Sequence, residues 1–278
     1  MAITAAMVKD LREKTGVGMM DCKKALVESG GDEEKAIAFL REKGLAKAAK
    51  KAGRATSEGV VGTYISADGK TATLVELMCE TDFVAKGEDF QGFAANLAEQ
   101  IAGLDVTTGV AADLPAEMVD VSGLIGKLGE NMGVGRFAKV AADGVVGVYI
   151  HSNMKIGVLV ALDGTDDAAI GKDIAMQVAA VNPLCVSSDE VPQDLLEKEK
   201  EIYRNQGLEE GKPAEIVEKI MIGRVNKYYK EVCLLEQPFI KDDKKSIKQY
   251  LKEAAGGAKV LSFTRLALGE GAPSSDEE

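Results

Sequence analysis

Residues 58–77 read EGVVGTYISADGKTATLVEL, and residues 143–162 read DGVVGVYIHSNMKIGVLVAL. The two stretches align without gaps at an offset of 85 residues, and ten of the twenty positions are identical. Each copy has runs rich in Val, Tyr and Ile on both sides of a turn, at residues 67–69 in the first and 152–154 in the second. Such runs around a turn are typical of β-hairpins. The chain therefore contains an internal duplication, and each copy is expected to form a hairpin.

The residues that follow each hairpin extend the duplication to a larger unit. An apolar helical face is expected after each copy, made of Phe90, Phe93, Leu97 and Ile101 in the first and of Ile170, Ile174 and Val178 in the second. A further β-like segment then closes each copy, at residues 136–140 and 262–266. The predicted fold class is α+β, with two duplicated subdomains at 55–142 and 143–271, each an antiparallel sheet covered by helices on one face.

The second copy contains a long insertion before its last strand. Pro192 and Pro213 each precede an apolar stripe of helical spacing, and a short loop joins the two stripes. This pattern predicts an antiparallel helical hairpin at about residues 190–230. The sequence leaves open whether the hairpin protrudes or lies flat on the sheet.

Residues 1–54 differ in charge from the rest of the chain. They carry 12 basic and 8 acidic side chains, whereas the remaining 224 residues carry 22 basic and 37 acidic ones. Three short apolar patterns of helical spacing, separated at Thr15-Gly16 and at Gly30-Gly31, predict a separate three-helix N-terminal module. Its last segment, residues 43–54, has five positive charges and no negative one. Two interpretations stay open for this segment: a patch for RNA or an acidic partner, or a solvated helix end where the dipole favours lysine.

The composition argues against several functional classes. The chain has 278 residues and a net charge of −11. Because acidic side chains outnumber Lys and Arg, the composition argues against nucleic-acid binding that depends mainly on neutralising phosphates. His151 is the one histidine, and neither a nucleophile elbow, a Walker loop nor a dinucleotide-binding glycine pattern occurs. We therefore expect a protein that is not an enzyme and that holds no metal and no cofactor.

Sequence features also suggest where the protein works. No window approaches the ~18 uninterrupted apolar residues of a membrane span, and the first residues lack the pattern of a secretory signal. The four cysteines, at 22, 79, 185 and 233, lie far apart, which favours reduced thiols over a disulfide framework or a zinc site. We expect a cytoplasmic protein without membrane contact. Residues 272–278 are predicted to be a disordered acidic tail.

The two copies diverge at two places that suggest function. After its second strand the first copy continues through Phe83, among charged neighbours, where the second copy has only small and acidic residues. In the hairpin turn, Ser66 of the first copy is replaced by His151 in the second. Taken alone, an isolated phenylalanine is more often packed under a loop, and a turn histidine is more often exposed without a role.

Two motifs resemble those of a known family. Residues 11–26, LREKTGVGMMDCKKAL, resemble the N-terminal hallmark of the bacterial translation elongation factor Ts family, and residues 81–85, TDFVA, resemble its second hallmark. The resemblance covers essentially the whole chain. It implies a ubiquitin-associated-like three-helix module, two α+β core subdomains and a coiled-coil hairpin. Longer members of the family continue with a further helical module, where this chain has residues 269–278.

The resemblance further implies a guanine-nucleotide exchange factor for the GTPase elongation factor Tu. The family segment that enters the G domain of Tu near its magnesium, and weakens magnesium and GDP, corresponds here to Thr81, Asp82, Phe83 and Val84. The aromatic ring is expected to act as the wedge. Tu would be bound in its GDP-bound and nucleotide-free forms, without direct binding of nucleotide or DNA by the factor itself.

Other matched positions complete the expected contact surface. His151 matches a family histidine near the phosphate-binding loop of Tu, and the N-terminal positions that pack on a G-domain helix correspond to Leu11, Met19 and Met20. The alternative function is an RNA- or ribosome-binding module that uses residues 43–54, and a hydrolase with scattered carboxylates is a third hypothesis. The sequence leaves the assembly open between a monomer, a homodimer and a 2:2 complex with Tu.

Overall fold

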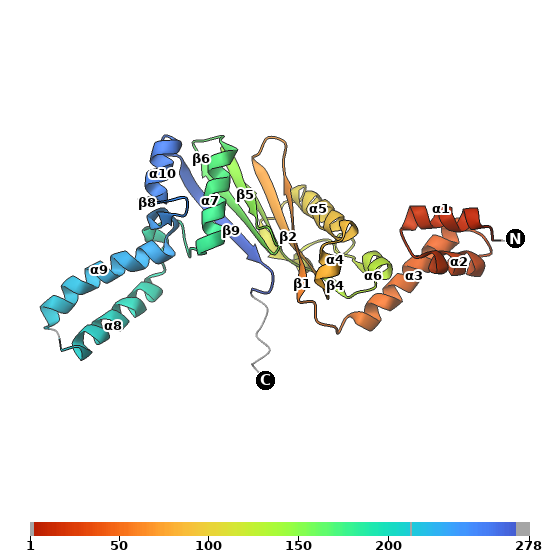
Figure 1. Cartoon of the computed structure of the whole chain (residues 1–278), viewed down its shortest axis with the longest axis horizontal. Coiled ribbons are helices and arrows are strands. Elements are labelled where there is room, and N and C mark those ends of the chain that lie inside the picture. Colours follow the sequence, from red (N-terminus) through yellow and green to blue (C-terminus); the bar gives the residue numbers. More distant parts are fainter. Residues whose placement is uncertain (1–2, 212, 271–278) are drawn as a thin grey trace.

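The computed structural model describes residues 3–211 and 213–270 of the chain. The molecule is elongated: the N-terminal helices form one end, the β-sheets lie in the middle, and a hairpin of long helices projects at the other end (Figure 1). The predicted α+β class is therefore confirmed. The division of the chain at residues 54, 142 and 271 stays a prediction, and the predicted acidic tail at 272–278 lies outside the described residues.

The N-terminal module consists of α1 (Ala5–Thr15), α2 (Met19–Glu28) and α3 (Glu33–Lys51). Local chemistry sets the helix ends. The side chains of Thr4 and Asp32 accept hydrogen bonds from the first turns of α1 and α3, and Gly16 takes the left-handed conformation that ends α1. The apolar faces of the three helices meet in a small core formed by Val8, Leu11, Cys22, Ala25, Leu26, Ala36 and Leu40.

The second half of α3 attaches this module to the first sheet unit. There α3 crosses α6 (Ser122–Leu128), and the crossing is close because glycine stands at the contact. A Cβ on Gly44 would lie 3.2 Å from the carbonyl oxygen of Ser122, and one on Gly126 would lie 3.5 Å from the Cα of Gly44. The basic segment 43–54 is thus helical as far as Lys51 and packs along one side on α6.

The first copy forms a four-stranded antiparallel sheet in the order β1-β2-β4-β3. Its strands are β1 (Glu58–Ile65), β2 (Thr71–Cys79), β3 (Thr108–Val110) and β4 (Met132–Ala141). The first hairpin and the closing strand were expected, whereas the short edge strand β3 was not. Helix α5 (Glu88–Ala102) covers one face, with Phe90, Leu97 and Ile101 buried as its spacing predicts.

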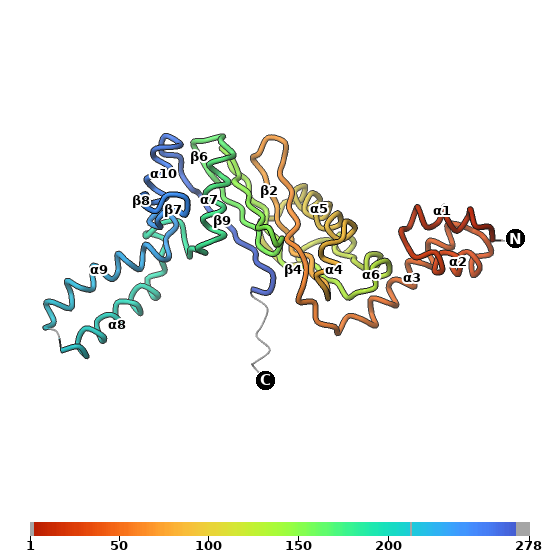
Figure 2. Tube along the Cα trace, in the orientation of Figure 1, coloured from red at the N-terminus to blue at the C-terminus, as the bar shows by residue number. Residues whose placement is uncertain are grey.

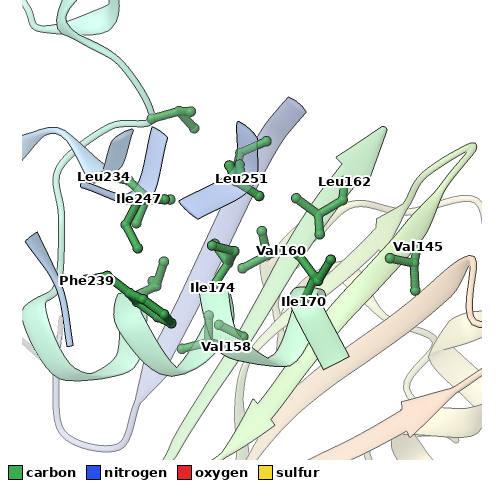
Figure 3. Packing of buried hydrophobic residues seen from close by; sticks show 14 residues of the cluster. Val145, Val158, Val160, Leu162, Ile170, Ile174, Leu234, Phe239, Ile247 and Leu251 are labelled. Atoms are coloured by element: carbon green, nitrogen blue, oxygen red, sulfur yellow. The ribbon is translucent and has the colours of Figure 1, made fainter. Parts of the chain in front are cut away.

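The second copy forms a three-stranded antiparallel sheet in the order β5-β6-β9. Its strands are β5 (Val145–Ile150), β6 (Ile156–Asp163) and β9 (Lys259–Ala267), covered by α7 (Ala168–Val181). The segment before β9 adds β7 (Pro238–Phe239), β8 (Asp242–Ser246) and α10 (Ile247–Ala254). Figure 3 shows side chains of α7 and β6 meeting Leu234, Phe239, Ile247 and Leu251 of this segment in one core.

One glycine in each copy lets the covering helix lie close on its hairpin. A Cβ on Gly62 would lie 2.5 Å from the carbonyl oxygen of Ala94 in α5. The equivalent Gly147, 85 residues later, meets the carbonyl of Gly171 in α7 even more closely. Both positions are among the ten identities of the repeat, and the contact explains why neither copy has a side chain there.

The two sheets pack face to face, and each hairpin turn reaches the other copy. The backbone N–H of Val61 donates to the carbonyl of Met154 (2.7 Å), and that of Val146 donates to the carbonyl of Gly69 (2.9 Å). These two bonds are equivalent at the offset of 85 residues. The lysines beside the turns behave alike: Lys155 pairs with Glu58 (2.7 Å), and Lys70 donates to the carbonyl of Asp143, the residue equivalent to Glu58 (2.6 Å). Each turn is therefore held by the edge of the other copy.

The predicted helical hairpin consists of α8 (Gln193–Glu209) and α9 (Ala214–Val232). The two helices run side by side and project away from the second sheet (Figures 1 and 2), which settles the question that the sequence left open. Gly207 of α8 permits close contact, because a Cβ there would lie 3.0 Å from the Val217 side chain.

Candidate partner-binding site

The chain leaves β2 through a single helical turn, α4 (Asp82–Ala85), which displays Phe83. Phe83 is 84% exposed, the highest value among the large hydrophobic residues in the described part of the chain. An exposed phenylalanine gains nothing from its own fold, since its apolar surface stays in water. The interpretation of Phe83 as a residue packed under a loop is therefore wrong, and the ring is free to contact another molecule.

The neighbours of Phe83 hold this turn on the protein. Ala85 is buried, and Val84 is half-buried against the same cluster as Val60 and Phe90. Asp82 forms an ion pair with Lys86 (2.6 Å), and this hydrogen bond lowers the pKa of the Asp82 carboxyl. α4 thus turns two apolar residues inward, one aromatic ring outward, and keeps a carboxylate beside that ring.

Thr81 caps the turn and is engaged at every polar atom. Its hydroxyl accepts from the Val84 N–H (3.4 Å) and donates to Glu130 (2.6 Å), and its N–H donates to the same carboxylate (3.0 Å). Its carbonyl accepts from the thiol of Cys79 (3.2 Å). Glu130 was not singled out from the sequence, because it lies 49 residues away and belongs to no motif that was recognised there.

His151 lies in the β5–β6 turn and is exposed, with its Nδ1 3.1 Å from the Tyr149 hydroxyl. The same turn forms one wall of a groove whose other wall includes Asp82 and Lys86 of the Phe83 segment. Two bonds described above, from Val61 to Met154 and from Lys155 to Glu58, fix the turn there. The structure therefore brings the His151 turn and the Phe83 turn together on one side of the molecule, although they lie 68 positions apart in the sequence.

The N-terminal residues expected to contact a partner divide into two kinds. Met19 and Met20 begin α2 and are 50% and 76% exposed. Leu11 is fully buried in the core of the module, so the expectation that it packs on a partner is corrected. The physical reason is its position on α1, three residues after Val8 on the face that meets α2 and α3. Leu11 supports the module from inside, and the two methionines form the apolar surface.

The basic segment 43–54 makes internal ion pairs. Lys43 and Lys47 both bind the carboxylate of Asp21, at 2.5 and 3.0 Å. Their hydrogen bonds, that of Lys43 first, lower the pKa of Asp21. These two cations therefore tie the start of α2 to the middle of α3.

Two further cations of the same segment contact the first sheet unit. Lys51 donates to the carbonyl of Gly129, and Arg54 pairs with Glu80 (3.3 Å). Four of the five positive charges in 43–54 thus have a partner within the protein. This pairing argues against the interpretation of the segment as an RNA patch, which needs cations free for phosphates.

The remaining candidate chemistry is sparse. All four cysteines are free and buried, and the thiols of Cys185 and Cys233 lie 3.8 Å apart. Burial raises the pKa of Cys79 to about 11 and that of Cys233 to about 12. Residues 3–211 and 213–270 contain no cluster of three or more acidic, histidine or cysteine side chains that could hold a metal ion. No helix within these residues is both long and apolar enough to cross a membrane.

Comparison with known proteins gives one consistent result. A family model described as "Elongation factor TS" matches residues 80–270. The protein named elongation factor Ts from Nitratidesulfovibrio vulgaris (strain DP4) is 52% identical over 290 aligned residues, which cover 99% of both chains. Proteins of the same name from Clostridium kluyveri (strain ATCC 8527) and Clostridium botulinum (strain Eklund 17B) are 52% and 53% identical, each over 99% of this chain and 96% of their own length.

Proposed function

The chain belongs to the elongation factor Ts family, and we propose that it binds the GTPase elongation factor Tu and promotes the release of GDP during translation elongation. In this proposal the protein promotes nucleotide exchange by binding alone and makes or breaks no covalent bond. It would act in the cytoplasm, where translation takes place. The observation that carries the proposal is the exposed ring of Phe83 on a turn whose other residues are fastened to the sheet.

Exchange needs a difference in affinity rather than a catalytic group. If a factor binds nucleotide-free Tu more tightly than it binds Tu·GDP, linkage requires that it lowers the affinity of Tu for GDP by the same ratio. Magnesium demands a near-ideal octahedron of oxygen ligands, so a small displacement of the residues around it is enough to weaken it. A phenylalanine ring suits this task because it is rigid, has few rotamers to lose and gains free energy when a partner buries it.

The other exposed residues extend the proposed contact. Asp82, paired with Lys86 beside the ring, is proposed to enter the G domain of Tu together with Phe83. His151, on the same side of the molecule, is proposed to reach the phosphate-binding loop of Tu. Met19 and Met20 offer an adaptable apolar surface, which suits the flank of a helix. These contacts supply binding free energy that the wedge uses to displace the magnesium.

A stopped-flow experiment tests the proposal. Tu carrying a fluorescent GDP analogue is mixed with excess unlabelled GDP, with and without the protein. We expect the release rate to rise with factor concentration to a plateau, and added magnesium to oppose the effect. A release rate that stays at the spontaneous value at micromolar factor refutes the proposed function. A pull-down from cell extract, with and without GDP and magnesium, provides an independent check, since nucleotide should compete with the factor.

A further inference from the structure

We propose that Glu130 is the positioning residue for the turn that displays Phe83. The inference rests on the proposed exchange function and adds to it a residue that contacts neither Tu nor nucleotide in this role. One carboxylate accepts three hydrogen bonds from two consecutive residues at the base of α4. The donors are the N–H of Glu80 (3.2 Å), the N–H of Thr81 (3.0 Å) and the hydroxyl of Thr81 (2.6 Å).

The location of these bonds is what makes them important. Backbone pairing between β2 and β4 ends where Cys79 lies opposite Met132. Beyond that pair, side-chain carboxylates replace the carbonyls of the sheet. Glu130 serves the N–H groups of residues 80 and 81, and Glu80 in return accepts from the N–H of Asn131 (2.6 Å). The two chain segments thus stay joined for two more residues, up to the residue before α4.

The joint is supported by a second contact. Asn131 is buried, and its side-chain amide donates to the carbonyl of Arg54 (2.7 Å), while Arg54 pairs with Glu80. These contacts restrain the backbone next to Glu130, so its carboxylate stays close to residues 80 and 81. A charged acceptor bound by several donors is also stronger than a neutral one.

The second copy lacks this arrangement. Its equivalent strand pairing ends with Asp163 opposite Lys259, and the residues just before β9 are Gly257 and Ala258, which have no carboxylate. The N–H of Gly164 bonds to the neighbouring Asp163 side chain instead of reaching across the sheet. Among residues 3–211 and 213–270, this three-bond carboxylate occurs in the copy that displays the aromatic ring and not at the equivalent place of the other copy. The contrast indicates that Glu130 serves the display of Phe83 rather than the shared fold.

The physical need for it follows from the length of α4. An isolated helix of four residues is unstable because its nucleation is unfavourable, so the conformation of α4 depends on the contacts that hold its two ends. The far end is held by the Gln91 side chain, which donates to the carbonyl of Ala85 (3.2 Å). Without Glu130, the near end loses three bonds and samples other conformations. Binding to Tu must then reorder the turn, and the entropic cost of this ordering reduces the free energy that Phe83 contributes to binding.

The experiment measures how fast GDP leaves Tu in the presence of each of four proteins: the wild type, Glu130→Ala, Phe83→Ala and the double variant. We expect Glu130→Ala to lower the concentration-dependent release rate about tenfold, which corresponds to about 1.4 kcal/mol. In the Phe83→Ala background the same change is expected to have almost no further effect, because Glu130 acts only through the ring. A merely structural role predicts instead that the two losses multiply.

Matched variants separate positioning from general damage. Glu190→Ala is the control, since its carboxylate also accepts a backbone N–H, that of Val186 (3.0 Å), but in the other copy. It should cost stability without altering release. Thr81→Val removes one of the three donors to Glu130 and should slow GDP release from Tu as a mild Glu130 variant does. If Glu130→Ala folds poorly, Glu130→Gln takes its place, because its amide oxygen can still accept the N–H bonds of residues 80 and 81, whereas its amide nitrogen no longer accepts the Thr81 hydroxyl.

Hydrogen exchange on the isolated protein makes the two proposals separable. In Glu130→Ala the amides of residues 80, 81 and 84 should exchange faster, with the rest of the first sheet unchanged. If wild-type protein fails to speed GDP release, the proposed function fails, and faster exchange at these amides still supports the positioning of the turn. If the wild type and Phe83→Ala behave as proposed but Glu130→Ala releases GDP at the wild-type rate, the positioning role is overturned.

Discussion

Replacing Phe83 by alanine removes the ring on which the proposed mechanism depends. Complete burial of a phenylalanine side chain is worth about 1.5–3 kcal/mol, and with 84% of the residue exposed nearly all of that gain remains for a partner to supply. We expect the variant to lose about 2 kcal/mol of interaction with nucleotide-free Tu. At 1.4 kcal/mol per factor of ten, GDP release slows about 30-fold at factor concentrations below saturation.

The same exposure predicts that the fold does not change. An exposed side chain without internal partners affects the free energy of unfolding by about 0.5 kcal/mol at most, so thermal melting should coincide with that of the wild type. Leu261→Ala is the control, since Leu261 is a large hydrophobic residue, 53% exposed on β9. The assay is stopped-flow release of a fluorescent GDP analogue from Tu, at factor concentrations on both sides of the plateau. Release at the wild-type rate by a folded Phe83→Ala protein refutes the wedge, and so does an equal loss with Leu261→Ala.

Three further predictions test other parts of the structure. His151→Ala should slow GDP release less than Phe83→Ala does, and an equal or larger loss in the same assay would show that the two roles are inverted. Gly147→Ala should lower the free energy of unfolding by about 1–3 kcal/mol, because the new Cβ meets the carbonyl of Gly171; an unchanged denaturant midpoint would mean that α7 can move away. At pH 8 a thiol reagent should label the native protein slowly, because the pKa values of Cys79 and Cys233, about 11 and about 12, leave little thiolate below them, whereas unfolded protein should expose all four thiols quickly; rapid native labelling would contradict the burial.

Much of the fold could be predicted because the hairpin pattern occurs twice in the sequence, and each copy supports the interpretation of the other. Identical Val, Gly and Tyr positions in both copies point to one hairpin, and the helical faces after them follow from ordinary spacing. The edge strand β3 was missed because three residues with exposed ends leave no alternation to detect. Helix α10 was missed although Ser246 and Gln249 form a capping box that the sequence contains.

The candidate site was predictable only in part. Phe83 stood out because the second copy has nothing like it, and an isolated aromatic between charged residues is a local signal. Leu11 was misassigned because a motif match does not say which side of a helix faces inward, whereas its spacing from Val8 does. Glu130 has no local signal at all, since its role arises from strand pairing that joins distant residues. The meeting of the His151 turn with the Phe83 turn is likewise a product of tertiary packing.

The contacts of each hairpin turn with the other copy have a symmetry that the sequence repeat alone does not show. Val61 bonds to residue 154, and its counterpart Val146 bonds to residue 69, the counterpart of 154. Contacts of this reciprocal kind, in which i meets j and j meets i, define an isologous interface between identical subunits. The middle of the molecule is thus built like a symmetric pair of subunits within one polypeptide. The two halves need not be alike outside this interface, so one carries the exposed ring of Phe83 and the other the imidazole of His151 while the contacts between them stay reciprocal.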